Sequence, residues 1–258
     1  MLTSLQNPLI KEIRKLHSSK GRREQQLFLL EGTHLLEEAC AVKHPIATVC
    51  CTVEWQEQHR ELWERVGELA DRTELVSEKV LESIATTVQP DGIVATAPRT
   101  ATSPVELSTL GLALETIQDP GNLGAIVRTA AAANADGLLL SSDSADLDHP
   151  KVLRASAGAW FKLPMAVCSD LRAEVSRCQN RGMQILATVP DASLTYWEVD
   201  LRMPTLIVLG NEGSGLSAEL ISLADRQVQI PLHRGVESLN VSIASALILY
   251  EAQRQRSY

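Results

Sequence analysis

The strongest constraint on the fold is the regular alternation of short apolar segments with longer segments of helical spacing. In the C-terminal part, the apolar runs over 137–142, 183–189 and 205–210 have the length and composition of buried strands. Segments between such runs, for example 170–182, repeat their apolar residues at the spacing of amphipathic helices. Strands that alternate with helices are typical of a mostly parallel sheet covered by helices on both faces, so the sequence predicts an α/β fold.

The same pattern divides the chain. In the second half it predicts strands over 112–118, 137–142, 162–168, 183–189, 205–210 and 226–232, and helices over 123–134, 149–158, 170–182, 217–225 and 240–256. In the first half it predicts helices over 5–17, 33–42, 55–70 and 78–87, and strands over 26–32, 47–53, 73–77 and 91–98. Residues 99–109 are rich in Ser, Thr and Pro, as in a linker. We therefore expect a smaller α/β domain over 1–98, a linker over 99–109 and a larger domain over 110–258.

Composition excludes several classes of protein. The 258 residues include 45 % hydrophobic residues, which is ordinary for a globular chain. No apolar stretch approaches the roughly 20 residues of a membrane span, and the N-terminus lacks the apolar core of a signal peptide. The five cysteines are odd in number and show no Cys-x-x-Cys spacing, which argues against a metal site or a disulfide framework. These features predict a cytoplasmic protein without membrane association or bound metal.

The charge is unevenly distributed. The net charge is −8, yet residues 1–23 carry six basic side chains and one acidic side chain. The basic residues are Lys11, Arg14, Lys15, Lys20, Arg22 and Arg23. A basic segment in an otherwise acidic protein can contact nucleic-acid phosphates, but a solvated amphipathic helix explains the same charges.

Three loops that follow predicted strands are unusual. In the first, residues 118–124 ("QDPGNLG"), Asn122 is predicted to cap the helix over 123–134. Arg128 then stands alone among small apolar residues. A charge in such a segment needs a partner, because burying it unpaired is expensive. Either Arg128 pairs with a nearby acid on a helix-packing surface, or its partner is a ligand.

The other two loops are rich in glycine and polar residues. In 209–217 ("LGNEGSGLS"), three glycines surround Glu212, but the spacing matches neither a dinucleotide-binding fingerprint nor a phosphate-binding P-loop. In 230–242 ("IPLHRGVESLNVS"), Ser238 and Asn240 stand where the last helix begins. Either of them can cap that helix, or the loop grips a ligand. Ligands of parallel sheets bind in loops of this kind, at the carboxyl ends of the strands.

Taken together, the three loops carry a specific resemblance. "DPGNLGAIVRTAAAANADGLLL", "LIVLGNEGSGLS" and "IPLHRGVESLNVSIASALILYEAQRQR" resemble the three motifs of the SpoU (TrmH-type) RNA ribose 2′-O-methyltransferases of the SPOUT superfamily. "HPKVLRASAGAWFKLP" is also similar to that family, so that the resemblance covers residues 110–258. The first half, from "LQNPLIKEIRKL" through "FLLEGTHLLEEA", resembles the small L30e-like RNA-binding domain that often precedes the catalytic domain.

The resemblance implies a catalytic domain with a deep trefoil knot, and a homodimer with the last helix at its interface. It implies that the cofactor is S-adenosylmethionine, with contacts from Thr188, Leu209, Gly210, Ile230, Ser238 and Leu239. The reaction it implies is methyl transfer to a ribose 2′-hydroxyl, with catalytic roles for Arg128, Asn122, Glu212 and Asn240. Arg128 would bind the phosphate or the attacking oxygen of the RNA, since its pKa is too high for a general base. The six basic residues near the N-terminus would contact RNA.

Several functions stay open at this point. Ribosomal RNA is the expected substrate because of the N-terminal domain, and transfer RNA is the alternative. A non-catalytic RNA-binding protein on the same fold is a second alternative, although the chain retains the polar residues of the motifs. A generic nucleotide-binding α/β enzyme is a third, and it lacks a matching phosphate loop.

Overall fold

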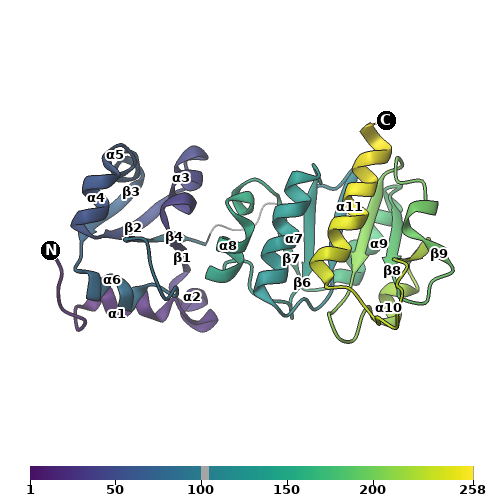
Figure 1. The fold of residues 1–258 in the computed structure, drawn as a ribbon, viewed down its shortest axis with the longest axis horizontal. Helices are drawn as coiled ribbons and strands as arrows, with labels where there is room; N and C mark the ends of the chain where they lie inside the picture. Colours follow the sequence, from purple (N-terminus) through teal and green to yellow (C-terminus); the bar gives the residue numbers. More distant parts are fainter. Residues whose placement is uncertain (100–104, 258) are drawn as a thin grey trace. The chain divides into compact units, whose positions relative to one another are not determined.

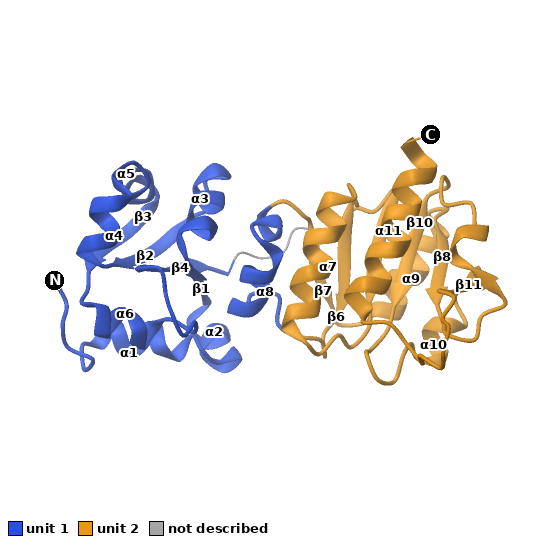
Figure 2. Cartoon of the chain, in the orientation of Figure 1, with its two compact units in different colours: residues 1–101, 146–161 blue, residues 102–145, 162–258 orange. Residues whose placement is uncertain are grey.

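The computed structural model describes residues 1–99 and 105–257 and divides into two compact units. Unit 1 comprises Met1–Ala101 with Asp146–Phe161, and unit 2 comprises Thr102–Ala145 with Lys162–Tyr258 (Figure 2). Asp146–Phe161 therefore belongs to unit 1, although it lies within the predicted larger domain over 110–258. Residues 100–104 of the predicted linker lie outside the described residues. The domain limits drawn from the sequence stay a prediction.

Unit 1 is built on a four-stranded sheet of order β1-β4-β2-β3. Its strands are β1 Leu27–Glu31, β2 Ile46–Cys51, β3 Ala70–Leu75 and β4 Ile93–Pro98. Its helices are α1 Pro8–Lys15, α2 Ser19–Gln25, α3 Thr33–Ala41, α4 Val53–Gln58, α5 Arg60–Leu69, α6 Glu78–Ile84 and α8 Pro150–Ser156, with a short 3-10 turn at Ala159–Phe161. The helix predicted over 55–70 is thus two helices that meet at His59, and α2 was not predicted.

The segment 146–161 completes the core of unit 1. Leu153 of α8 is fully buried in the hydrophobic cluster that contains Phe28 and Leu30 of β1. Trp160 lies against Phe28, with ring centroids 5.2 Å apart. Burial of large apolar and aromatic side chains is the main stabilising contribution to such a core. Unit 1 therefore depends on residues that are distant from it in the sequence.

Unit 2 contains a seven-stranded sheet of order β7-β6-β5-β10-β8-β11-β9, in which every pair of neighbours is parallel. Its strands are β5 Leu110–Leu114, β6 Gly137–Ser141, β7 Met165–Cys168, β8 Gln184–Thr188, β9 Leu194–Thr195, β10 Thr205–Leu209 and β11 Arg226–Gln229. Its helices are α7 Pro120–Ala132, α9 Leu171–Asn180, α10 Ala218–Ile221 and α11 Val241–Ser257, with a 3-10 turn at Tyr196–Glu198. The prediction of a mostly parallel sheet is confirmed.

Helices cover both faces of this sheet (Figure 1). Helices α7 and α11 pack against each other on one face. On the other face, α9 covers a core that includes Ala113, Leu139 and Val208 from three neighbouring strands. Side chains that alternate along each strand supply both layers, so the central strands β5 and β10 are buried throughout. This arrangement gathers the loops after β5, β8, β10 and β11 at the carboxyl edge of the sheet.

Candidate functional site

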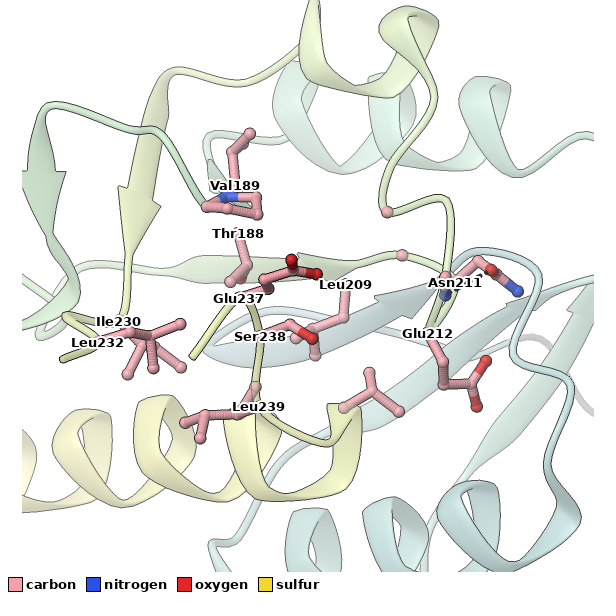
Figure 3. A pocket seen from close by; sticks show the side chains of 16 residues that line it. Thr188, Val189, Leu209, Asn211, Glu212, Ile230, Leu232, Glu237, Ser238 and Leu239 are labelled. Atoms are coloured by element: carbon pink, nitrogen blue, oxygen red, sulfur yellow. Dashed lines mark hydrogen bonds between the residues drawn. The ribbon is translucent and has the colours of Figure 1, made fainter. Parts of the chain in front are cut away.

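A cavity of about 290 Å³ lies at the carboxyl ends of β8, β10 and β11 (Figure 3). All six residues predicted to bind the cofactor line it, and they are Thr188, Leu209, Gly210, Ile230, Ser238 and Leu239. These residues come from three loops that are separated in the sequence, and the parallel order β10-β8-β11 brings the loops together. The structure thus gathers the complete predicted set in one place.

The glycine loop that forms one wall of this cavity folds back on itself. The backbones of Asn211 and Gly215 exchange two hydrogen bonds of 3.0 Å each. A Cβ atom on Gly210 would lie 2.3 Å from the carbonyl carbon and oxygen of Gly215. No side chain fits in that space, so this position requires glycine for close approach of two backbone segments.

Asn122 does not cap the helix that follows it, and this part of the sequence prediction is wrong. Helix α7 begins at Pro120, and the carboxylate of Asp119 caps it by accepting from the N–H groups of Gly121 and Asn122, at 2.6 and 2.9 Å. Proline is favoured at the first helical position because it has no N–H to leave unpaired. The earlier start leaves the side chain of Asn122 free to bond elsewhere.

That side chain joins two of the predicted catalytic residues. Asn122 Nδ2 donates to Glu212 Oε1 at 3.0 Å, and Asn122 Oδ1 accepts from Asn240 Nδ2 at 2.9 Å. Asn240 Oδ1 in turn accepts from the N–H of Ser242 at 2.9 Å and so caps α11. The three residues form one hydrogen-bonded row. They line a second, open cavity that shares Glu212, Ser238 and Leu239 with the first one.

The environment of Glu212 keeps it ionised. Partial burial alone raises the pKa of this carboxyl, but hydrogen bonds from Asn122 and from the backbone N–H groups of Gln118 and Asp119 outweigh that effect. The net result is a pKa below the ordinary value. Hydrogen bonds to the charged form of an acid favour that form. Glu212 therefore carries a negative charge at neutral pH beside both cavities.

Arg128 lies apart from this row. It sits on α7 with its side chain exposed, and among residues 1–99 and 105–257 it has no ion pair or side-chain hydrogen bond. The alternative of pairing with a nearby acid is therefore not what the described part of the chain shows. Neither of the two cavities includes Arg128 in its wall. The structure brings Asn122, Glu212 and Asn240 together and leaves Arg128 open to solvent.

The basic residues near the N-terminus divide into two groups. Lys11, Arg14, Lys15, Lys20 and Arg23 are exposed on α1 and α2, although Lys15 pairs with Glu12 at 2.7 Å. Arg22 is only 1 % exposed and pairs with Asp146 and Asp148, at 2.9 and 3.2 Å. The prediction that Arg22 contacts RNA is therefore wrong, because its guanidinium is used inside unit 1 to pair two carboxylates.

Sequence reasoning missed two polar residues of the main cavity. Glu237 lines it beside Ser238, with its carboxylate directed into the cavity, and Asn211 lines it beside Glu212 (Figure 3). Both lie inside loops that the sequence analysis singled out, so their position was the available signal. What distinguishes Asn211 from other loop residues is its hydrogen bond to the carbonyl of Thr116, which is far away in the chain.

Comparison of the sequence with known protein families assigns this chain to one of them. Residues 109–250 match the SpoU rRNA Methylase family, and residues 7–95 match the MRM3-like substrate binding domain. The first match spans more than half of the chain. This chain belongs to the SpoU rRNA methylase family. The predicted family is thereby confirmed, and so is the α/β fold with a smaller N-terminal α/β domain. The trefoil knot stays a prediction.

Relatives of this SpoU-family chain match it over nearly its full length. An uncharacterized tRNA/rRNA methyltransferase of Synechocystis is 47 % identical over 99 % of this chain and 94 % of its own. The 23S rRNA (guanosine(2553)-2′-O)-methyltransferase RlmP of Bacillus subtilis is 30 % identical over 96 % of this chain and 97 % of its own. The crystal structure of an AdoMet-bound rRNA methyltransferase from Sinorhizobium meliloti superposes with a TM-score of 0.88 at 32 % identity, covering 98 % of this chain and 97 % of the other.

Proposed function

We propose that this chain transfers a methyl group from S-adenosylmethionine to a ribose 2′-hydroxyl of ribosomal RNA. The observation that carries the proposal is the junction of two cavities at Glu212, Ser238 and Leu239. One cavity gathers all six predicted cofactor residues, and the other adjoins the row of Asn122, Glu212 and Asn240. Donor and acceptor of a methyl group must meet at such a junction, because transfer requires both in contact and aligned.

The main cavity suits S-adenosylmethionine chemically. Thr188 Oγ1 is buried without a hydrogen-bond partner among the described residues. Buried polar atoms normally have a partner, and a ligand in this cavity can supply one. Glu212 and Glu237 line the cavity, and its described wall contains no Lys, Arg or His. Two carboxylates without a basic side chain favour a cationic ligand, and the sulfonium donor carries a net positive charge.

The remaining residues orient and activate the hydroxyl. When bound, S-adenosylmethionine supplies a methyl group that is already a good electrophile. Asn122 is held by Glu212 and Asn240 at the mouth of the open cavity, where it orients the ribose or its backbone. Arg128 binds the phosphate or the attacking oxygen as a fixed fork of donors and lowers the pKa of the hydroxyl. The proton of the hydroxyl leaves to phosphate, solvent or Glu212.

The choice of ribosomal RNA rests on the relatives and on unit 1. RlmP of Bacillus subtilis is named as a 23S rRNA methyltransferase, which favours ribosomal over transfer RNA. Residues 7–95 match a substrate binding domain. The exposed basic residues of α1 and α2 supply cations for RNA phosphates, and they are Lys11, Arg14, Lys15, Lys20 and Arg23.

A homodimer along α11 is part of the proposal. Ile243, Leu247 and Tyr250 form an apolar stripe on this helix and are 52, 37 and 50 % exposed. Such a stripe is typical of a protein interface. Helix α7, which carries Arg128, packs against α11, which carries the stripe. A Leu247→Asp variant is then expected to elute as a monomer in size-exclusion chromatography with light scattering, whereas Val167→Asp, a change at another exposed apolar residue, leaves a dimer.

The expected compartment is the cytoplasm. All five cysteines are free thiols buried in the structure, and a reducing compartment keeps thiols in that state. Among the helices of the described residues, none is long and apolar enough to cross a membrane.

The test uses the full chain with labelled-methyl S-adenosylmethionine and RNA from cells that lack this protein. Ribosomal and transfer RNA are separated before the reaction, digested to nucleosides afterwards and analysed by mass spectrometry. A 2′-O-methylated nucleoside from ribosomal RNA supports the proposal, and one from transfer RNA alone contradicts the substrate. Cofactor binding without methylation of any RNA, including RNA in assembling ribosomal subunits, points to a non-catalytic RNA-binding protein. Preferential binding of a nicotinamide or adenine nucleotide would contradict the cofactor.

A further inference from the structure

Thr116 has an unusual backbone conformation just after β5. Glu115 still pairs with β10, because its N–H donates to the carbonyl of Leu209 at 2.9 Å. At Thr116 the backbone turns into the left-handed region with φ +55°. A β-branched residue rarely adopts that conformation, because its side chain crowds the backbone. The surrounding structure must therefore hold it there.

Every polar atom of Thr116 is held by a neighbouring loop. After β6, Ser141 Oγ accepts from the Thr116 N–H at 2.7 Å, and Asp143 Oδ2 accepts from its hydroxyl at 2.8 Å. After β10, Asn211 Nδ2 donates to the Thr116 carbonyl at 2.8 Å. The side chain of Asn211 has a second task, since its Oδ1 accepts from the N–H groups of Gly213 and Ser214, at 2.8 and 2.9 Å.

These contacts lie close to two of the hydrogen-bond donors of the Glu212 carboxylate. Two and three residues beyond Thr116, the N–H groups of Gln118 and Asp119 each point at a Glu212 oxygen from 3.4 Å. Glu212 itself follows Asn211 directly in the chain. The hydrogen bond from Asn211 to Thr116 therefore links the two loops one residue before the carboxylate and two residues before the first N–H group. At 3.4 Å the N–H contacts are long, so a small shift of either loop breaks them.

We propose that Asn211 is a positioning residue for methyl transfer, which acts by holding Thr116 in its left-handed conformation and so aligning Glu212 with Gln118, Asp119 and Asn122. The inference rests on the proposed methyl transfer and assigns Asn211 no contact with substrate. It explains why a loop that already contains three glycines also contains an asparagine with both ends of its amide engaged. It also explains how a strained threonine is kept beside the site.

The test is a double-mutant cycle with Asn211→Ser and Thr116→Gly. A serine at 211 can still accept from a nearby backbone N–H, but it is shorter and has no amide to donate to Thr116. We expect kcat to fall about fivefold to tenfold, the effect of losing one aligned hydrogen bond, while the Kd for S-adenosylmethionine changes by less than about twofold. The acidic limb of the rate–pH profile should move to higher pH, because Glu212 loses donors that lower its pKa.

The Thr116→Gly change is expected to reduce the loss of kcat caused by Asn211→Ser. Glycine adopts a positive φ without strain, so the conformation no longer needs the bond from Asn211. The effect of Asn211→Ser on kcat should then be smaller in the Thr116→Gly background than in the wild type. Asn180→Ser, at an exposed asparagine of α9, is the matched control and should leave kcat and the pH profile unchanged.

The outcomes separate this inference from the function on which it rests. An active wild type whose Asn211→Ser variant keeps its kcat and its pH profile overturns the inference. Additive effects in the double-mutant cycle, or a lower melting temperature as the only change, also overturn it. A wild type that binds S-adenosylmethionine but methylates no RNA overturns the proposed function instead.

Discussion

Replacement of Gly210 by alanine tests the geometry of the cofactor cavity most directly. The added Cβ would lie 2.3 Å from the carbonyl carbon and oxygen of Gly215 and 2.4 Å from the nitrogen of Leu216. All three atoms belong to the backbone, so no side-chain rotation can relieve the overlap. Carbon atoms in proteins make their closest favourable contacts at about 3.5 Å or more. The glycine loop must therefore open, and with it the hydrogen bonds between Asn211 and Gly215.

The expected loss of affinity follows from that overlap. Forcing an extra methyl group into a packed region typically costs about 1–3 kcal/mol. If the loop opens in the free protein and must close again around the ligand, the cost falls on binding. Because about 1.4 kcal/mol corresponds to a factor of ten, the Kd for S-adenosylmethionine should rise about fivefold to a hundredfold. If the folded protein cannot relieve the overlap by opening the loop, the cost falls on stability and the melting temperature drops.

A matched control lies in the same loop. A Cβ on Gly213 would meet only Asn211 Oδ1, at an ordinary contact distance of 3.5 Å. Isothermal titration calorimetry with S-adenosylmethionine, together with a melting curve, compares Gly210→Ala and Gly213→Ala with the wild type. Gly213→Ala should stay within about twofold of the wild-type Kd, a difference well below 1 kcal/mol. If Gly210→Ala binds as tightly as Gly213→Ala and melts at the wild-type temperature, the described loop geometry is wrong.

Three further predictions concern charged residues. Arg22→Met removes one of the two arginines that pair with the half-buried Asp146 and the buried Asp148, and Arg99 remains as a partner of both. It should lower the free energy of unfolding of unit 1 by about 3 kcal/mol in chemical denaturation, the lower end of the range for a broken buried pair. Burial, together with the charge of Asp146, raises the pKa of Asp148 to about 7. The folded state then holds a proton that the unfolded chain releases above about pH 4. The free energy of unfolding of the wild type, relative to that of Asp148→Asn, should therefore fall between pH 5 and 7 when denaturation is measured across a pH series. Arg128→Ala should abolish methylation without changing the Kd for S-adenosylmethionine, and Arg172→Ala, at an exposed arginine of α9, should retain activity; full methylation by Arg128→Ala would contradict its role.

The parallel sheet and its ligand-binding edge could be predicted from local pattern. Strands such as β10 are continuous apolar runs, and the loops after them carry glycine and polar residues that a simple connection does not need. Parallel strands place such loops at one edge, so the loops over 118–124, 209–217 and 230–242 were expected together. The grouping of Thr188 with Leu239 came from the resemblance to the SpoU family. The order of strands and loops along the sequence is enough to predict this edge, because every strand in the sheet runs in the same direction.

The contacts of Asp146–Phe161 could not be predicted in the same way. The helix α8 was expected near its observed limits, but local pattern does not say which core receives a helix. Its association with unit 1 depends on Leu153 in an apolar cluster and on Asp146 and Asp148 beside Arg22. Arg22 misled the sequence analysis for the same reason, because a paired buried cation and a solvated one look alike in a basic segment.

Asn240 shows why two interpretations of one residue need not compete. From the sequence, this residue either caps the last helix or belongs to a ligand site. In the structure its Oδ1 caps α11 through Ser242, while its Nδ2 donates to Asn122. An aspartate would cap a helix equally well, but it has no proton to donate and would add a charge beside Glu212. The donor end of the amide therefore distinguishes an asparagine required by the site from one required only by the helix, and it can be recognised only once the partner segment is in place.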